Sequence, residues 1–182
     1  MNVFAPSLPV EPPTWWEQAN LYYSAVQNDG HFSVRVYVFP ASGEVTSDSP
    51  GPLRLQLEAS ASGFHVLDGD AHERGRIDFE LPKIRIRGAM RRDGCHMWKL
   101  SARSLVLKRH AVQFTTGDSW LFHTPWFSWL GIAGVQNGQV RVFGHVGPTR
   151  RLWILRVDPD CDHLDLLSLL AMMHRNWWLP LG

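Results

Sequence analysis

The chain has 182 residues, of which 45% are hydrophobic and 19% are charged, and its formal net charge is +1. This length suits one domain, and the hydrophobic content supplies a core that disordered chains lack. A chain that is basic throughout, as general polyanion binders are, is excluded by the near-neutral charge. We expect an extended proline-rich segment over residues 1–13 and a single folded domain over residues 14–182.

The first residues, MNVFAPSLPVEPP, lack the positive region and the apolar run of a secretory signal. No stretch reaches the roughly 18 apolar residues that a membrane-spanning helix needs. The two cysteines, Cys95 and Cys161, are expected to stay reduced. These features predict a cytoplasmic protein, peripheral at the membrane if its ligand is a lipid.

Residues 14–23, TWWEQANLYY, predict a short helix, because Thr14 and Glu17 have the spacing of a capping box. From His31 onward, alternating apolar and polar residues predict about twelve β-strands. Their ranges are 31–39, 52–60, 64–69, 76–81, 83–88, 97–102, 104–110, 111–117, 119–124, 131–136, 139–145 and 152–157. The pairs Asp93-Gly94 and Asn137-Gly138 and the triplet Asn28-Asp29-Gly30 indicate hairpin turns, so the strands should form an antiparallel meander.

A second helix is predicted over about residues 160–176, where leucines and methionines follow one another with few polar interruptions. A surface helix would carry one apolar stripe, so this helix should be buried on most sides. The sequence therefore predicts a closed antiparallel β-barrel of about twelve strands around the helix. The alternative is a smaller half-barrel that the helix caps.

Twelve predicted strands followed by RRLWILRVDPDCDHLDLLSLLAMMHRNWW resemble the tubby C-terminal-like superfamily, which includes scramblase-like and LURP-one-related proteins. The resemblance is architectural, covers most of the chain after Leu21, and carries over no individual signature residue. It implies a twelve-stranded barrel around a C-terminal hydrophobic helix, and a tendency to bind lipids. A pleckstrin-homology-like half-barrel with its own C-terminal helix is the alternative.

The near-neutral total conceals two opposed blocks of charge. Residues 1–82 hold eleven acidic and four basic side chains, a net charge of −7, whereas residues 83–109 hold nine basic and one acidic, a net charge of +8. On a strand, Lys83, Arg85 and Arg87 fall on one face, and Arg91 and Arg92 extend the cluster. This basic face predicts binding of an anionic lipid or an acidic protein. Alternatively, it is solvated or paired with the acidic block. Nucleic acid is not expected, because no recognised nucleic-acid-binding motif is present.

Two groups of aromatic residues are candidates for hydrophobic contact with a partner. Trp126, Phe127 and Trp129 follow Pro125 in the segment SWLFHTPWFSWLG, and Trp177 and Trp178 follow the predicted helix. If exposed, such residues form an interface hot spot or a membrane-interface wedge; if buried, they fill the end of a barrel.

Searches for catalytic and metal-binding patterns find only weak candidates, so we predict no catalytic residue, metal or cofactor. Cys95-His96 and Cys161 with His163 offer zinc ligands without the usual spacing. The acidic run DPDCDHLD lacks the glycine and glutamate of a calcium loop. Asp118, Ser119 and His123 have the residue types of a hydrolase triad, but without the GxSxG pattern.

We therefore expect a non-enzymatic binding module that recognises a protein partner or an anionic membrane lipid through a basic strand face and an aromatic edge. One alternative is a structural subunit of a homo- or hetero-oligomer, docking through its Trp-rich loop and C-terminal tail. Another is an enzyme or ligand pocket with an unusual His/Cys site.

Overall fold

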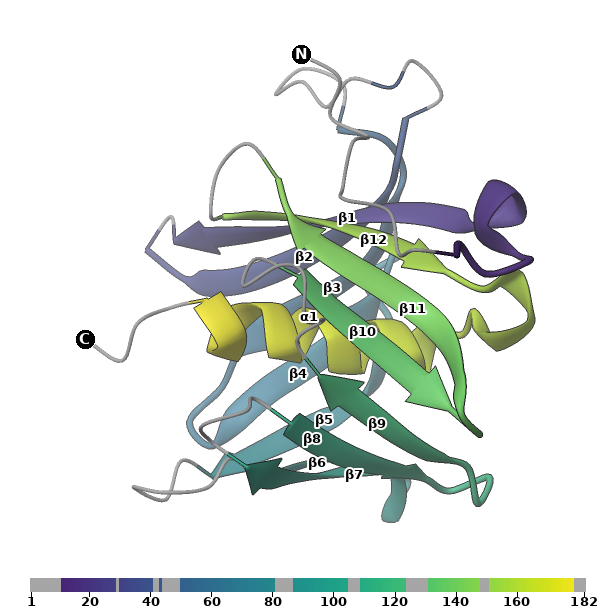
Figure 1. Ribbon diagram of the computed structural model, residues 1–182. Helices are drawn as coiled ribbons and strands as arrows, with labels where there is room; N and C mark the ends of the chain where they lie inside the picture. Colours follow the sequence, from purple (N-terminus) through teal and green to yellow (C-terminus); the bar gives the residue numbers. More distant parts are fainter. Residues whose placement is uncertain are drawn as a thin grey trace.

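The computed structural model describes residues 11–28, 30–40, 43, 50–80, 87–104, 109–123, 131–147 and 151–178. Its strands surround a single helix, α1, which is drawn in yellow in Figure 1. The elements are η1 (Trp16–Gln18), β1 (Asn20–Asn28), β2 (Phe32–Val38), β3 (Leu53–Ala59), β4 (Gly63–Asp68), β5 (Glu73–Glu80), β6 (Arg87–Arg92), β7 (Cys95–Ser104), β8 (Arg109–Phe114), β9 (Ser119–His123), β10 (Gly131–Gln136), β11 (Gln139–Val146), β12 (Leu152–Val157), η2 (Pro159–Cys161) and α1 (Leu164–Trp178).

The twelve strands form one closed antiparallel barrel, in which each strand pairs with its neighbours along the chain and β1 pairs with β12. The closing pair aligns Asn20 with Val157 and Ala25 with Leu152. The predicted closed barrel is thus confirmed, and the half-barrel alternative is wrong. Since every described strand has a partner on both sides, none of them leaves a whole edge of backbone amides and carbonyls unpaired.

Tight hairpins join several strands, as the sequence predicts. Asp93 and Gly94 have φ angles of 51° and 79°, and Asn137 and Gly138 have φ angles of 51° and 76°. Two consecutive positive φ values are typical of the turns whose twist matches that of paired strands. These turns connect β6 to β7 and β10 to β11.

The start of the domain differs from the prediction. In place of a helix over residues 14–23, the structure has only the short 3-10 helix η1, and Asn20 already begins β1. Tyr22 is opposite Leu155 and Val38 on its two neighbouring strands. Pairing on both sides outweighs the local capping signal, because tertiary packing overrides helix propensity.

The helix α1 fills the barrel. Residues 166–173 are 0 to 3% exposed. Because the strands enclose the helix on nearly all sides, apolar residues occupy nearly all of its faces. Two glycines on the inner wall leave space for side chains of the neighbouring strands. A Cβ atom at Gly134 would lie 2.6 Å from the Phe122 ring, and one at Gly144 would lie 2.8 Å from the Ile132 side chain. The helix starts at Leu164, after the separate 3-10 turn η2, and so a few residues later than predicted.

Two buried polar groups fix the position of α1 along the barrel. The Trp98 indole N–H donates to Ser168 Oγ over 3.1 Å, and Ser168 Oγ donates in turn to the Asp165 carbonyl over 2.7 Å. Two turns further along the helix, His174 Nδ1 lies 2.8 Å from Ser24 Oγ, and its ring stacks on Trp153. Sliding the helix would break the Trp98–Ser168 and Ser24–His174 bonds inside an apolar core, where unpaired polar groups are costly.

Candidate functional site

Basic side chains gather on the outer face of β6 and β7. Met90 is fully buried inside the barrel, so the alternation of a strand turns Arg87 and Arg91 outward on β6. Lys99 lies on the outer face of β7, opposite Ala89 of β6. Arg87, Arg91 and Lys99 are all exposed. Part of the predicted basic face is therefore present on the folded barrel.

These residues border a surface groove of about 1030 Å³ on the outside of β5 to β10, which we call the outer groove. The strand register arranges its outward side chains in two rows. The first row crosses from Ala89 through the polar residues Lys99 and Gln113 to Ser119. A second row runs from Arg87 through Ser101, Ala111 and Leu121 to Val135.

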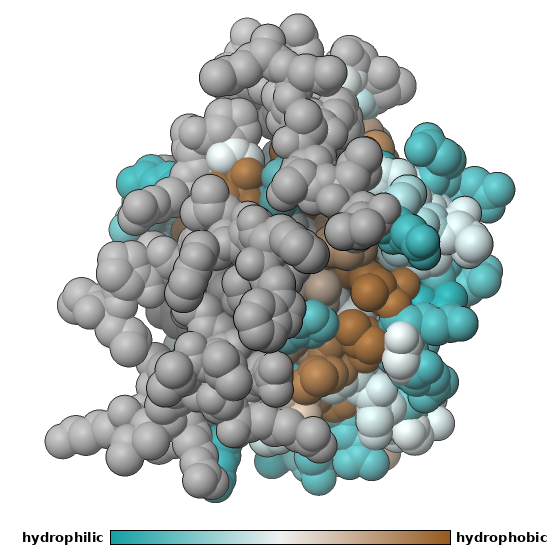
Figure 2. Space-filling model, viewed as in Figure 1, coloured by the Kyte–Doolittle hydropathy of each residue, from teal (hydrophilic) through white to brown (hydrophobic). Residues whose placement is uncertain are grey.

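The second row ends in an apolar floor made of Ala111, Leu121 and Val135, all of them half-buried. Figure 2 shows hydrophobic surface gathered over the region where Figure 1 places β10 and its neighbours. The outer groove therefore combines a basic rim with an apolar floor.

Among the residues that line the outer groove, Asp78 is the single carboxylate. Its Oδ2 lies 3.3 Å from Arg91 Nε, with both side chains about half exposed. Among the side chains that the structure describes, which do not include that of Glu80 opposite Arg87, Arg87 and Lys99 form no ion pair. The pKa of His96 in the same groove is lowered, first by burial and then by the charges of Lys99 and Arg91. The groove therefore carries an excess of positive charge.

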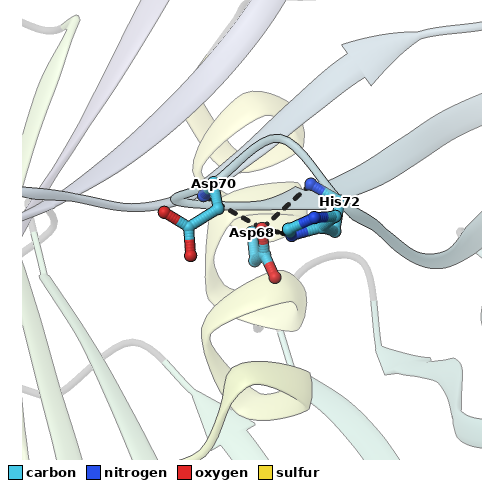
Figure 3. Close-up of side chains that lie close together, drawn as sticks. All are labelled: Asp68, Asp70 and His72. Atoms are coloured by element: carbon cyan, nitrogen blue, oxygen red, sulfur yellow. Dashed lines mark hydrogen bonds and ion pairs between the residues drawn. The ribbon is translucent and has the colours of Figure 1, made fainter.

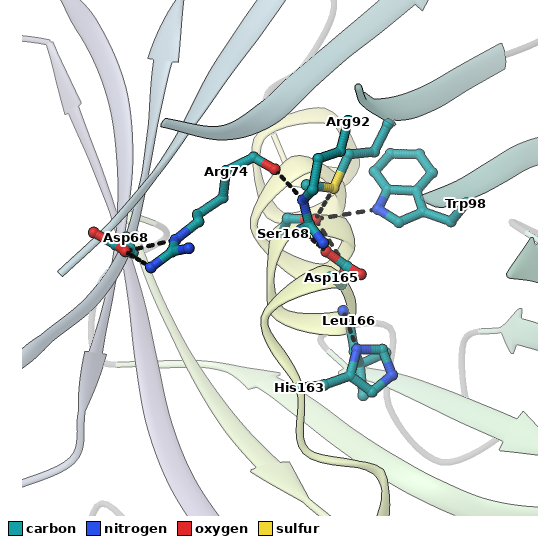
Figure 4. A network of polar contacts seen from close by, with 9 residues as sticks. Asp68, Arg74, Arg92, Trp98, His163, Asp165, Leu166 and Ser168 are labelled. Carbon is teal, nitrogen blue, oxygen red and sulfur yellow. Dashed lines mark hydrogen bonds and ion pairs between the residues drawn. The ribbon is translucent and has the colours of Figure 1, made fainter. Parts of the chain in front are cut away.

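Arg92 lies apart from this groove, although it is next to Arg91 in the sequence. Its side chain reaches the start of α1, where it contacts Asp165 Oδ1 at 2.6 Å and donates from Nε to the Arg74 carbonyl (Figure 4). Arg74 in turn pairs with Asp68 at 2.6 Å. Arg92 thus pairs with the start of α1 and not with the outer groove, whereas Arg91 pairs with Asp78 inside the groove.

The same end of the barrel carries a polar depression of about 810 Å³ beside the start of α1. Asp68 and Asp70 line this depression. Figure 3 shows that Asp68, Asp70 and His72 lie close together, with potential metal-ligand atoms within 4.8 Å of one another. Asp68 Oδ1 accepts the backbone N–H groups of Asp70 and His72, and Oδ2 accepts from Arg74. These bonds lower the pKa of Asp68, the His72 amide contributing most. They account for the cluster as a stabilised hairpin turn.

The structure does not describe the side chains of the remaining predicted contact residues. Lys83, Arg85, Trp126, Phe127 and Trp129 lie outside the described residues. Trp177 and Trp178 form the last turn of α1, but their side chains are outside the description. Hydrophobic contact between these aromatic residues and a partner therefore stays a prediction.

The weak metal candidate does not assemble. Cys95 and His96 begin β7, whereas Cys161 and His163 precede α1, and no three of these four residues bring ligand atoms within 4.8 Å of one another. Cys161 Sγ donates instead to Gln136 Oε1 over 3.5 Å, and burial raises the pKa of this thiol.

The triad-like residues are also dispersed. Ser119 and His123 stand at the two ends of β9, four residues apart, which corresponds to roughly 13 Å along a strand. Asp118 accepts a hydrogen bond from Thr116 within the preceding turn. These three side chains have no catalytic arrangement.

The apolar floor of the outer groove is the part that sequence reasoning missed. A signal for it exists in the segments AVQF, SWLF and GIAGVQ, where apolar residues occupy both faces of a strand. One apolar face belongs to the core, so the second one had to lie on the outside of the barrel.

Comparisons with protein-family models, with curated protein sequences and with solved structures found no match. Among the described residues, no helix has both the length and the hydropathy that crossing a bilayer requires.

Proposed function

We propose that this protein is a non-enzymatic binding module that holds an anionic partner in the outer groove. The observation that carries the proposal is the meeting of Arg87, Arg91 and Lys99, with Asp78 as the single carboxylate, beside an apolar floor. The partner classes that fit this charge are an acidic protein surface and an anionic lipid surface. The resemblance to tubby-like barrels stays a prediction, and the proposal does not depend on it.

Two physical arguments support anion binding at this groove. The planar guanidinium groups of Arg87 and Arg91 match the geometry of carboxylate and phosphate oxygens, to which arginine donates two parallel hydrogen bonds. A single exposed ion pair contributes only about 0–1 kcal/mol, so recognition needs several cations and some apolar contact together. The outer groove offers both within one surface.

The test uses two anionic probes: agarose beads carrying poly-glutamate, and phosphatidylcholine vesicles containing roughly 20% phosphatidylserine. Binding of the full chain is measured by sedimentation with either probe. We expect Arg91→Glu and Lys99→Glu each to weaken binding roughly fivefold. Arg151→Glu, a charge-matched change at an exposed arginine outside the groove, should leave binding within about twofold.

Raised salt should weaken binding of the unchanged protein, since the contacts at the rim are exposed ion pairs. The proposal is wrong if neither probe binds. It is equally wrong if the three variants bind alike.

A further inference from the structure

We infer that the occupant of the outer groove is an acidic segment of a partner protein that places one aliphatic side chain on the floor formed by Ala111, Leu121 and Val135. This inference rests on the proposed function and names the partner class for the same site. It follows from the shape of the groove, from the arrangement of its charge and from the closure of the barrel.

The shape favours a narrow chain over a flat membrane. Contact with a bilayer interface needs apolar side chains that project into the lipid. Here the apolar residues are half-buried and lie beside the row that carries the longer, exposed side chains of Lys99 and Gln113. Among the described residues, the single large hydrophobic side chain classed as exposed is Val38, on β2 and outside the groove. A recessed floor can receive a side chain from a peptide.

The two rows of the groove set the chemistry of that peptide. Arg87 and Leu121 belong to the same row and are separated by three strand spacings, or roughly 14 Å. An extended peptide covers this distance in about four residues. The complementary segment therefore carries carboxylates on one side and an aliphatic residue about four positions away.

Closure of the barrel limits how such a segment is held. Strands β5 to β10 each pair with two neighbours, so a peptide cannot add itself as a further strand. Its affinity must come from its side chains. Loss of one aliphatic side chain should then be measurable.

The experiment compares three probes at low ionic strength. The first is a short fluorescein-labelled peptide of Glu and Asp residues with one Leu. The second is the same peptide with that Leu replaced by Ser, and the third is the phosphatidylserine vesicle described above. Affinity for the peptides is measured by fluorescence anisotropy, and the contacted amides are mapped by NMR on the isotope-labelled full chain.

We expect the Leu peptide to bind roughly tenfold more tightly than the Ser peptide, because one aliphatic side chain leaves water. Leu121→Ser should abolish this difference between the peptides. Val38→Ser, which removes an apolar side chain outside the groove, should preserve it. If Leu121→Ser does not fold, as judged by near-UV circular dichroism, Val135→Thr takes its place, because threonine is about as large as valine and its hydroxyl group can reach water at this half-buried position.

The outcomes separate the inference from the proposed function. Equal affinity for the two peptides, with sensitivity to Lys99→Glu, keeps the anion-binding function and overturns the aliphatic anchor. Binding of the vesicles alone, with the same sensitivity, keeps the function and assigns it to lipid, which also overturns the inference. If binding of every probe is insensitive to Lys99→Glu, the proposed function fails as well.

Discussion

His110 lies on the inner face of β8, opposite Phe122, with 6% of its surface exposed. Burial lowers the pKa of this imidazole from 6.5 to about 4. Between these two values the unfolded chain binds a proton that the folded chain does not. The free energy of unfolding is therefore unaffected by His110 above pH 6.5, and it falls as the pH is lowered from 6.5 to 4.

Replacing His110 with Gln, which keeps a polar side chain but cannot titrate, should reduce this acid sensitivity. Between pH 7 and pH 4.5, we expect the variant to lose about 2 kcal/mol less stability than the unchanged protein. Urea unfolding followed by tryptophan fluorescence at both pH values measures the difference. An equal loss in the two proteins would show that His110 does not contribute to acid unfolding.

Ser168 gives a second prediction for a single residue. Ser168→Ala leaves the Trp98 indole N–H without its acceptor inside the barrel, so the protein should lose about 1–2 kcal/mol of stability. Ser101→Ala, a matched change on the exposed outer face, should change stability by less than about 0.5 kcal/mol. Thermal unfolding of both variants provides the comparison, and equal melting temperatures would contradict the role of this bond.

Strand β6 carries two adjacent arginines, Arg91 and Arg92, that lie on opposite faces of the barrel wall. Because the strand continues to Arg92, alternation directs Arg91 outward to the groove and Arg92 to Asp165 of α1. The sequence interpretation extended the basic cluster through both residues, because its predicted strand ended at residue 88 and did not include them. The alternation that assigns Lys83, Arg85 and Arg87 to one face of a predicted strand would also assign the adjacent residues Arg91 and Arg92 to opposite faces.

Arg91→Ala and Arg92→Ala should therefore have opposite effects. We expect Arg91→Ala to weaken binding of the acidic probes and to leave the urea midpoint unchanged. Arg92→Ala should lower the free energy of unfolding by about 1 kcal/mol, because it removes a partly buried partner of Asp165, and should leave probe binding unchanged. Parallel titrations with urea and with the Leu peptide test both variants. Identical behaviour of the two would refute this division of roles.

The elements that could be predicted are those whose signal is local. The turns at Asp93-Gly94 and Asn137-Gly138, and the helix that is apolar on nearly all sides, depend on residues close in the sequence. Strand β1 could not be predicted, because both of its faces are apolar and its two partner strands decide its structure. The groove floor depends on the register of β8, β9 and β10, which no single segment contains.

At the scale of the whole molecule, α1 serves as the core of the barrel. The inner faces of all twelve strands surround it, and its residues from 166 to 173 are almost completely buried. Without the helix, the barrel would enclose a large empty volume, which a close-packed protein interior does not tolerate.

A chain that stops after His163 should accordingly lose its cooperative unfolding transition and bind a hydrophobic dye. Leu170→Ala in the full chain is the graded counterpart, with an expected loss of roughly 2–5 kcal/mol and a transition that remains cooperative. Calorimetry and dye fluorescence distinguish these states. A truncated chain that unfolds cooperatively at the melting temperature of the full chain would show that the barrel does not need α1.

Because β1 pairs with β12, the barrel can close only late in the synthesis of the domain. β1 leaves the ribosome first, yet the partner that closes the barrel is the last strand of the sequence, and the helix that fills the interior follows it. Until residue 157 has emerged, one side of β1 is unpaired, and until α1 follows, the inner faces of the strands have no core to cover. The barrel therefore completes its fold only after α1 has been translated. Until then, the exposed apolar faces and the unpaired edge of β1 make the partly synthesised barrel prone to aggregate.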